Sequence, residues 1–282
     1  MTRDKNRAMV ALGAAAATFV VIQLGSAAVQ DPDDAGLTIE VREKVRHFAA
    51  SGLPNHAIGR FTESLRAQDY EFQATTEPRR GRRATPLTRG VFGIAHNGVV
   101  FDPSNDERWN DQRRSGWTYE TVTNKPGYGL DINNGHIGSN GAYHYHGSPI
   151  GLLKDIPAGE DMRLIGYAAD GFPIYDQFGY VEPNDPESGT KKLSPSYRFK
   201  PGNRPTGPGG PHDGTFFEDW QYVEDVGDLD ECNGRTGVTP EYPDGTYYYV
   251  ITEKFPCVPR MFRGTPDRTF QGRRREQQRG DW

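Results

Sequence analysis

The sequence predicts a single, mostly β domain of antiparallel, sandwich-like architecture with long Gly- and Pro-rich loops. After the first thirty residues, helical periodicity is scarce and two-residue alternation between turn dipeptides recurs. The 282 residues include 34 Gly and 21 Pro, which punctuate the chain. The 14 Tyr, 14 Phe and 4 Trp supply apolar area that a disordered chain would lack. A β-barrel is the alternative way to arrange such strands.

The N-terminus has the pattern of a secretory signal peptide over residues 1–28. Three basic residues precede an apolar run, Met9–Leu24, and small residues follow at 25–28. The alternative is an uncleaved anchor, because a bilayer span needs roughly 17 to 25 residues. Either reading predicts an extracytoplasmic protein, periplasmic or secreted, which an uncleaved signal would hold at the membrane.

Alternating apolar residues and turn dipeptides place the strands in order. Leu37–Val45 and Tyr70–Ala74 alternate between apolar and polar side chains. Asn97–Gly98 and Asp170–Gly171 each separate two apolar runs, and such pairs favour the tight turn of a β-hairpin. Pro173 lacks an N–H group, which predicts that its strand lies at a sheet edge.

Three segments share a turn, a small residue and then aromatic residues. They are Asn140–His146, Asp213–Asp219 and Asp244–Val250. Their spacings are unequal, so we interpret them as recurrent local chemistry and not as a repeat architecture.

The domain is predicted to span residues 29–263, followed by a basic, disordered tail over 264–282. The tail is rich in Arg and has no apolar period. An electrostatic tether to an anionic envelope surface is the functional alternative for this tail.

The two cysteines, Cys232 and Cys257, are predicted to form a disulfide bond. An even number of cysteines in an exported chain favours pairing, because the compartment is oxidising. The alternative is that both remain free thiols and bind a metal.

The charge balance argues against nucleic acid as a partner. The formal net charge is −5, whereas phosphate binding needs a basic surface. Contact with an envelope or extracellular surface is the partner class that export leaves open.

The most informative segment contains three of the seven histidines, His136, His144 and His146. If Tyr143–His146 is a strand, alternation places His144 and His146 on one face and the two tyrosines on the other. A turn near residue 140 then brings His136 beside them. Neutral imidazoles suit a divalent transition metal such as copper or zinc. His56 is a remote candidate for a fourth ligand; the alternative is that all these histidines are hydrogen-bonded within an aromatic layer.

Several longer motifs in fixed order carry a family resemblance. They are Pro54–Gly59, Gly141–Gly147, Leu164–Tyr175, Asp228–Arg235 and Phe255–Arg260. In these the chain resembles the YHYH family, which is named for its Tyr-His-Tyr-His string and whose members resemble secreted or periplasmic proteins. Similar proteins often carry Tyr-His-Tyr where this chain has Tyr247–Tyr249. If that second histidine is a ligand in the family, the resemblance implies either that the metal hypothesis is weaker for this chain or that Tyr248 replaces it through its phenol oxygen.

Three functions are compatible with these residues. The first is an exported metal-binding protein that uses the histidine cluster. The second is a metal-dependent extracytoplasmic enzyme, which would add an open coordination position and a general base, with Asp131 as the candidate. The third is a metal-independent cell-surface or matrix interaction module in which the histidines are structural.

Overall fold

Strands dominate the computed structural model, which describes residues 36–59, 62–112, 114–123, 129–155 and 162–271. These residues belong to one unit and contain a single α-helix, α2 (Ile150–Asp155). The prediction of a mostly β domain is confirmed. No helix among the described residues has the length and apolar character to cross a bilayer. The predicted signal peptide, residues 1–28, lies outside them.

The largest sheet has eight strands in the order β15-β16-β10-β9-β5-β6-β8-β7. In chain order these are β5 (Gly93–Ala95), β6 (Val100–Phe101), β7 (Gly135–Ile137), β8 (Tyr143–Tyr145), β9 (Leu164–Ala168), β10 (Pro173–Tyr175), β15 (Gly234–Thr239) and β16 (Tyr242–Val250).

Two pairings in this sheet, β6 with β8 and β10 with β16, are parallel. The antiparallel prediction is wrong for these two, because long excursions after β6 and after β10 return the chain to the same end of the sheet. The prediction that Pro173 marks an edge is also wrong. β10 is an interior strand, and Pro173 is tolerated as its first residue.

Smaller sheets surround the large one, and they are antiparallel. The three-stranded sheet contains β1 (Leu37–Arg42), β2 (Val45–Ala50) and β3 (Tyr70–Thr75); the two-stranded pairs are β11 (Phe178–Tyr180) with β12 (Thr190–Lys192), β13 (Tyr197–Phe199) with β14 (Trp220–Tyr222), and β4 (Thr85–Pro86) with β17 (Met261–Phe262). Phe48 of β2 packs on Tyr167 of β9 with ring centroids 6.1 Å apart, which joins the three-stranded sheet to the large one.

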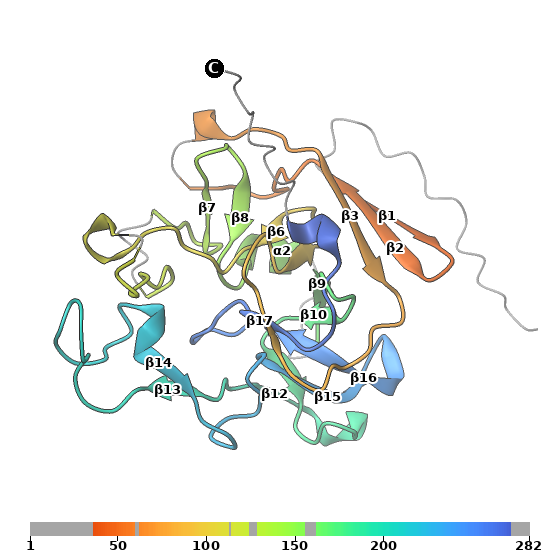
Figure 1. Ribbon diagram of the computed structural model, residues 1–282. Coiled ribbons are helices and arrows are strands. Elements are labelled where there is room, and N and C mark those ends of the chain that lie inside the picture. Colours follow the sequence, from red (N-terminus) through yellow and green to blue (C-terminus); the bar gives the residue numbers. More distant parts are fainter. Residues whose placement is uncertain (1–35, 60–61, 113, 124–128, 156–161, 272–282) are drawn as a thin grey trace, which may run out of the picture. The chain divides into compact units, whose positions relative to one another are not determined.

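The large sheet consists of two equivalent halves. Its strand order reads outward from the central β9–β5 pair as β10, β16, β15 on one side and β6, β8, β7 on the other. Figure 1 shows β7 and β8 well apart from β15 and β16. The central register is self-complementary, since Gly93 pairs with Ala168 and Ala95 pairs with Gly166. A local two-fold relationship therefore equates β5–β8 with β9, β10, β15 and β16.

Matching hydrogen bonds support this equivalence at the loops before β7 and β15. Asp131 Oδ1 accepts the backbone N–H groups two and four residues later at 2.8 and 3.2 Å, and Asp230 Oδ1 does the same at 2.9 and 3.2 Å. Tyr143 donates its hydroxyl to Asp131 at 2.7 Å, and Tyr247 donates to Asp230 at 3.0 Å. The two loops are built on the same aspartate–tyrosine bond.

This equivalence corrects the interpretation of the aromatic echo as local chemistry. Asn140–His146 and Asp244–Val250 occupy matching positions in the β7–β8 and β15–β16 hairpins, so they belong to a structural repeat. Asp213–Asp219 lies outside the repeat, in the segment that leads to β14.

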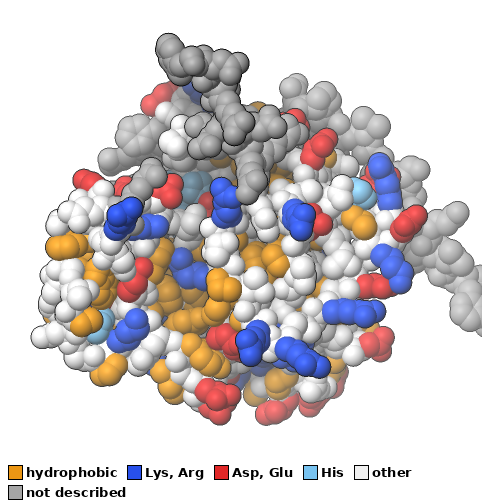
Figure 2. Space-filling view, viewed as in Figure 1, with side chains coloured by type: hydrophobic (Ala, Val, Ile, Leu, Met, Phe, Trp, Pro, Cys, Tyr) orange, Lys and Arg blue, Asp and Glu red, His pale blue; other side chains and the backbone are white. Residues whose placement is uncertain are grey.

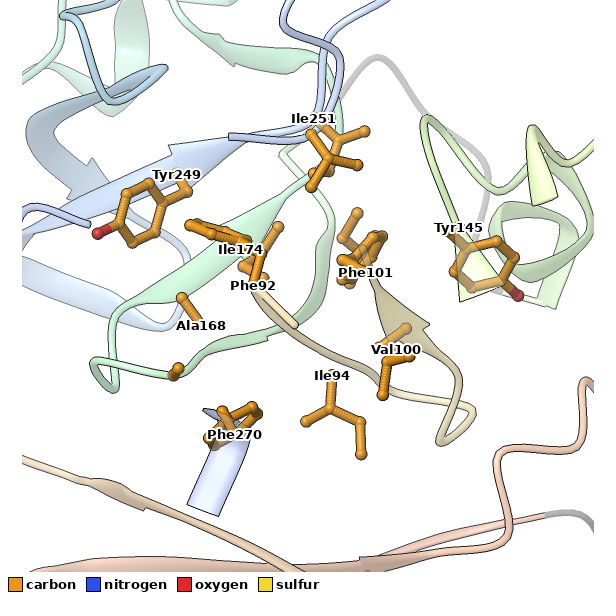
Figure 3. Close-up of a cluster of buried hydrophobic side chains, with 14 of the residues drawn as sticks. Phe92, Ile94, Val100, Phe101, Tyr145, Ala168, Ile174, Tyr249, Ile251 and Phe270 are labelled. Atoms are coloured by element: carbon orange, nitrogen blue, oxygen red, sulfur yellow. The ribbon is translucent and has the colours of Figure 1, made fainter. Parts of the chain in front are cut away.

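The core of the large sheet lies between the two halves. Figure 3 shows Tyr145 and Tyr249 at opposite ends, with Phe92, Phe101 and Ile174 between them. The hydroxyl of Tyr145 accepts a hydrogen bond from Asn97 Nδ2 at 2.8 Å, and the hydroxyl of Tyr249 donates to Asp170 Oδ2 at 2.5 Å. Both ends of the core therefore close on a buried, hydrogen-bonded tyrosine.

The predicted disulfide between Cys232 and Cys257 is not formed, and both residues are buried free thiols. Cys232 lies in the loop that Asp230 closes, and burial raises the pKa of its thiol to about 12. Cys257 lies in a turn with φ 57°, where its Sγ contacts the Glu253 carbonyl oxygen at 3.8 Å. Each sulfur is thus held in its own loop, and neither belongs to a group of potential metal ligands among the described residues.

The domain extends past the predicted boundary at residue 263. A 3₁₀ turn covers Arg268–Gln271, and the Phe270 ring stacks on Phe72 with centroids 4.3 Å apart. Phe270 is 2% exposed, and the Asp267 N–H donates to the Ala169 carbonyl at 2.9 Å. The first eight residues of the predicted tail are therefore folded, because Phe270 supplies an apolar anchor. Residues 272–282 lie outside the described chain.

Basic and acidic side chains are interspersed over the face of the molecule in Figure 2, together with apolar side chains. The exclusion of nucleic acid as a partner stays a prediction.

Candidate metal centre

The histidines meet on the hairpin formed by β7 and β8. Gly138 donates its N–H to the Ala142 carbonyl at 2.9 Å, and Gly141 takes the positive φ (82°) that the turn requires. His136 pairs directly with His144 in the antiparallel register. The predicted return of His136 to the side of the Tyr-His-Tyr-His strand is confirmed.

The three imidazoles converge on one point. His136 Nε2 lies 3.1 Å from His144 Nε2 and 3.2 Å from His146 Nε2. One ligand nitrogen from each ring lies within 4.8 Å of the other two. The rings meet edge to face, with centroids 4.7, 5.0 and 4.8 Å apart.

The tyrosines of the same strand point the other way. Tyr143 and Tyr145 are 1% and 0% exposed and belong to the main hydrophobic core. The predicted division of the strand into a tyrosine face and a histidine face is confirmed.

Burial favours the neutral, metal-binding form of the histidines. It lowers the pKa of His144, an effect that the negative charge of Asp102 opposes. Burial also lowers the pKa of His146 well below its usual value, and the neighbouring His144 and His136 add to that shift. His144 Nδ1 lies 3.3 Å from the Ala142 carbonyl, so a proton on Nδ1 leaves Nε2 as a lone pair facing the cluster.

The donor set fits a metal ion better than it fits hydrogen bonds alone. The single Nε2 of His136 contacts two other Nε2 atoms, and a neutral ring nitrogen offers either one N–H or one lone pair. Tetrahedral ligands at 2.0–2.1 Å from zinc lie about 3.4 Å apart, close to the two short separations. Three nitrogens on one side also leave a fourth coordination position for water or another ligand.

A family model described as YHYH protein matches residues 71–264, more than half of the chain and the whole histidine cluster. The chain belongs to the YHYH family. Searches among curated proteins and among solved structures found no match.

Two candidate residues are not at the cluster of this YHYH protein. His56 lies on the tyrosine face, with Nε2 2.5 Å from the Tyr145 hydroxyl and Nδ1 3.1 Å from Asn133 Nδ2. Its assignment as a fourth ligand is wrong, because its ring packs against the opposite side of the strand. Asp131 is wrong as a general base: Oδ1 caps its own loop, and Oδ2 accepts from Tyr143 and from the Gly59 N–H.

Tyr248 is also outside the cluster. The register of the repeat makes it the counterpart of His144, since it pairs with Arg235 as His144 pairs with His136. Its hydroxyl accepts a hydrogen bond from Arg235 Nε at 2.5 Å. Tyr248 therefore belongs to the other half of the sheet and does not complete the site.

The other half of the YHYH domain shows which residues occupy the positions equivalent to the histidines. There the positions of His144 and His146 hold Tyr248 and Val250, both 0% exposed. They pack into a small apolar cluster with four other buried residues, Met162, Tyr175, Leu193 and Leu229. The same backbone is thus stable with apolar side chains at these positions, so the fold itself does not require imidazoles there.

Sequence reasoning missed Asp102 and Arg260, which lie near the histidines. The N–H of Asp102 donates to the Tyr145 carbonyl at 2.9 Å, and the positive charge of Arg260 contributes to the lowered pKa of His146. Asp102 is the residue directly after strand β6, which ends at Phe101. No local signal marks either residue. Asp102 comes near the histidines through the parallel β6–β8 pairing, and Arg260 through its hydrogen bond to the Pro103 carbonyl at 2.6 Å.

A cleft of about 390 Å³ runs along β7, the last strand of the sheet, and His136 is one of its lining residues. Gly135, residues 137–139 and Asp131 are among the other residues that line it. Of the three histidines only His136 lines this cleft, which also borders Asp131 and Tyr143.

Proposed function

We propose that this YHYH protein is an extracytoplasmic protein that binds a divalent transition metal, copper or zinc, through His136, His144 and His146. The convergence of one ring nitrogen from each of the three histidines within 4.8 Å on one hairpin carries the proposal. Neutral imidazole suits both metals, and a three-nitrogen set with an open position is a recurrent way to hold zinc.

The energetics of burial support a functional role for these rings. His146 is 4% exposed, and its Nδ1 has no hydrogen-bond partner among the described residues. Burying an unsatisfied polar group costs roughly 1–3 kcal/mol, whereas Val250 fills the equivalent position without that cost. A bound cation would offset the cost by using the Nε2 lone pairs.

Metal analysis of protein purified without a histidine tag tests the proposal. We expect about one equivalent of copper or zinc after dialysis against the metals, and none in His144→Ala or His146→Ala. His47→Ala and His212→Ala are the controls, because both residues lie outside the cluster. At a free metal concentration of 100 Kd, binding should add about 2.7 kcal/mol to the unfolding free energy of the wild type.

One outcome would contradict the metal-binding proposal. If the wild type holds no stoichiometric copper or zinc and its melting temperature is unchanged by chelator, the histidines are structural. The interaction-module hypothesis would then take precedence.

Export is the second part of the proposal. It is supported by the basic residues, apolar run and small residues at the start of the chain. We expect the intact mass of the mature protein to lack about the first 28 residues, as signal removal requires. An intact N-terminus in a membrane fraction would indicate an anchor, and one in the cytoplasmic fraction would contradict export.

A further inference from the structure

Asp102 lies on the histidine face of the sheet. Phe101 and Tyr145 are paired in the parallel register, and their rings lie 5.7 Å apart on the tyrosine face. Because side chains alternate along a strand, the next residue, Asp102, points to the opposite face. That is the face on which His144 and His146 converge.

The other half of the sheet shows what a side chain at this position contacts. Tyr175 is the counterpart of Asp102, since Ile174 pairs with Tyr249 as Phe101 pairs with Tyr145. The ring of Tyr175 lies 5.4 Å from that of Tyr248, which is the counterpart of His144. The equivalent direction brings the Asp102 carboxylate toward His144.

Hydrogen bonds fix the Asp102 carboxylate through only one of its two oxygens. Asp102 Oδ1 accepts hydrogen bonds from the N–H of Ser104 at 2.8 Å and from its hydroxyl at 2.5 Å. Within the described chain no group donates to Oδ2. The group of three ligands within 4.8 Å does not include a carboxylate, so Asp102 lies outside the coordination sphere defined by the histidines.

The charge at this site also needs an anion. Three neutral imidazoles leave the full charge of a divalent cation uncompensated. The nearby cation, Arg260, is already opposed by the negative charges of Glu120 and Asp102. The Arg260 guanidinium packs over the Phe217 ring at 3.4 Å and donates to the Pro103 carbonyl at 2.6 Å. Asp102 is the carboxylate whose charge acts on His144.

We propose that Asp102 is the outer-sphere anchor of the metal site, whose free Oδ2 accepts a hydrogen bond from a water molecule or hydroxyl-bearing ligand at the open coordination position. This inference rests on the proposed metal-binding function. It makes Asp102 a positioning residue that selects ligands able to donate a hydrogen bond, and it explains why a carboxylate stands where the other half has Tyr175.

Zinc titration of the metal-free full chain against a competing chelator tests this role. Outer-sphere partners of metal ligands typically contribute 10- to 100-fold in affinity, so Asp102→Asn should weaken zinc binding by roughly that factor. Asp106→Asn is the matched control: it removes the same charge from the same loop at an exposed position, and we expect less than about a threefold change. Cobalt(II) absorption should retain its bands in Asp102→Asn, because the three nitrogen ligands remain.

The outcomes separate the two proposals. A wild type that binds no zinc contradicts the metal site itself. A wild type that binds zinc, with Asp102→Asn within threefold of it, overturns the role of Asp102 alone. If Asp102→Asn does not fold, Asp102→Ser replaces it, because it also removes the carboxylate; a zinc affinity within threefold of the wild type in that variant would likewise overturn the inference.

Discussion

Asn97 and Asp170 occupy the same hairpin position in the two halves of the sheet, yet only Asp170 can carry a charge. Each contacts the hydroxyl of the tyrosine that ends the core, Tyr145 or Tyr249. Burial raises the pKa of Asp170 to about 6, against the lowering effect of the Tyr249 and Gly264 hydrogen bonds. The substitution Asp170→Asn therefore gives the second half the uncharged amide that the first half has at Asn97.

Asp170→Asn should remove a pH-dependent part of the stability. The carboxyl titrates near 3.8 when unfolded and near 6 when folded. The folded state thus holds the proton longer, and its contribution is full below about pH 4 and is lost as the pH rises through about 6. We expect the wild type to lose about 2 kcal/mol relative to Asp170→Asn between pH 4 and pH 7.5, measured by urea unfolding in chelator. Parallel pH profiles for the two proteins would contradict the raised pKa.

At the scale of elements, the β7–β8 and β15–β16 hairpins offer a matched pair of glycines. Gly141 and Gly245 both have positive φ, 82° and 89°. A Cβ at Gly141 would lie 2.6 Å from Arg66 Cγ and 2.9 Å from the Ser64 carbonyl, whereas the nearest atom at Gly245 is 3.6 Å away.

Gly141→Ala should therefore be the more damaging of the two substitutions. Both impose a left-handed backbone on Ala, at about 1–2 kcal/mol, but only Gly141→Ala adds a steric clash. We also expect it to weaken zinc binding, because its hairpin carries His136 and His144, while Gly245→Ala leaves the zinc affinity unchanged. Chemical unfolding and zinc titration of both variants check this. Equal losses of stability, with zinc binding intact in both, would show that the hairpin tolerates the change.

The same elements show which parts of the fold and of the histidine site can be predicted from the sequence. Asn97–Gly98 and Asp170–Gly171 act locally, so their hairpins could be predicted, and so could the return of His136 beside His144. The parallel pairings, and with them Asp102, depend on where long loops return. Phe270 gave no periodic signal, because a single stacked ring anchors the end of the chain. The repeat was hidden by loops of unequal length between its matching strands.

For the whole sheet, the repeat separates structural requirements from functional ones. Both halves keep the aspartate-closed loop and the core tyrosine that donates to it, Tyr143 or Tyr247. They differ on the opposite face, where one half has an apolar cluster around Tyr248 and Val250 and the other has the histidines. The shared features account for folding, and the difference is where function should lie.

His146→Val copies the residue of one half into the other, and it should change stability in opposite directions with and without metal. In chelator we expect the variant to be more stable than the wild type by about 1 kcal/mol or more, because it removes a buried imidazole whose Nδ1 lacks a partner among the described residues. In zinc at 100 Kd the wild type gains about 2.7 kcal/mol and the variant gains little, so the order reverses. His47→Val, on strand β2 and outside the cluster, should show no such reversal. If His146→Val is equally destabilised in zinc and in chelator, the imidazole serves packing, and the contrast between the two halves reflects only different cores.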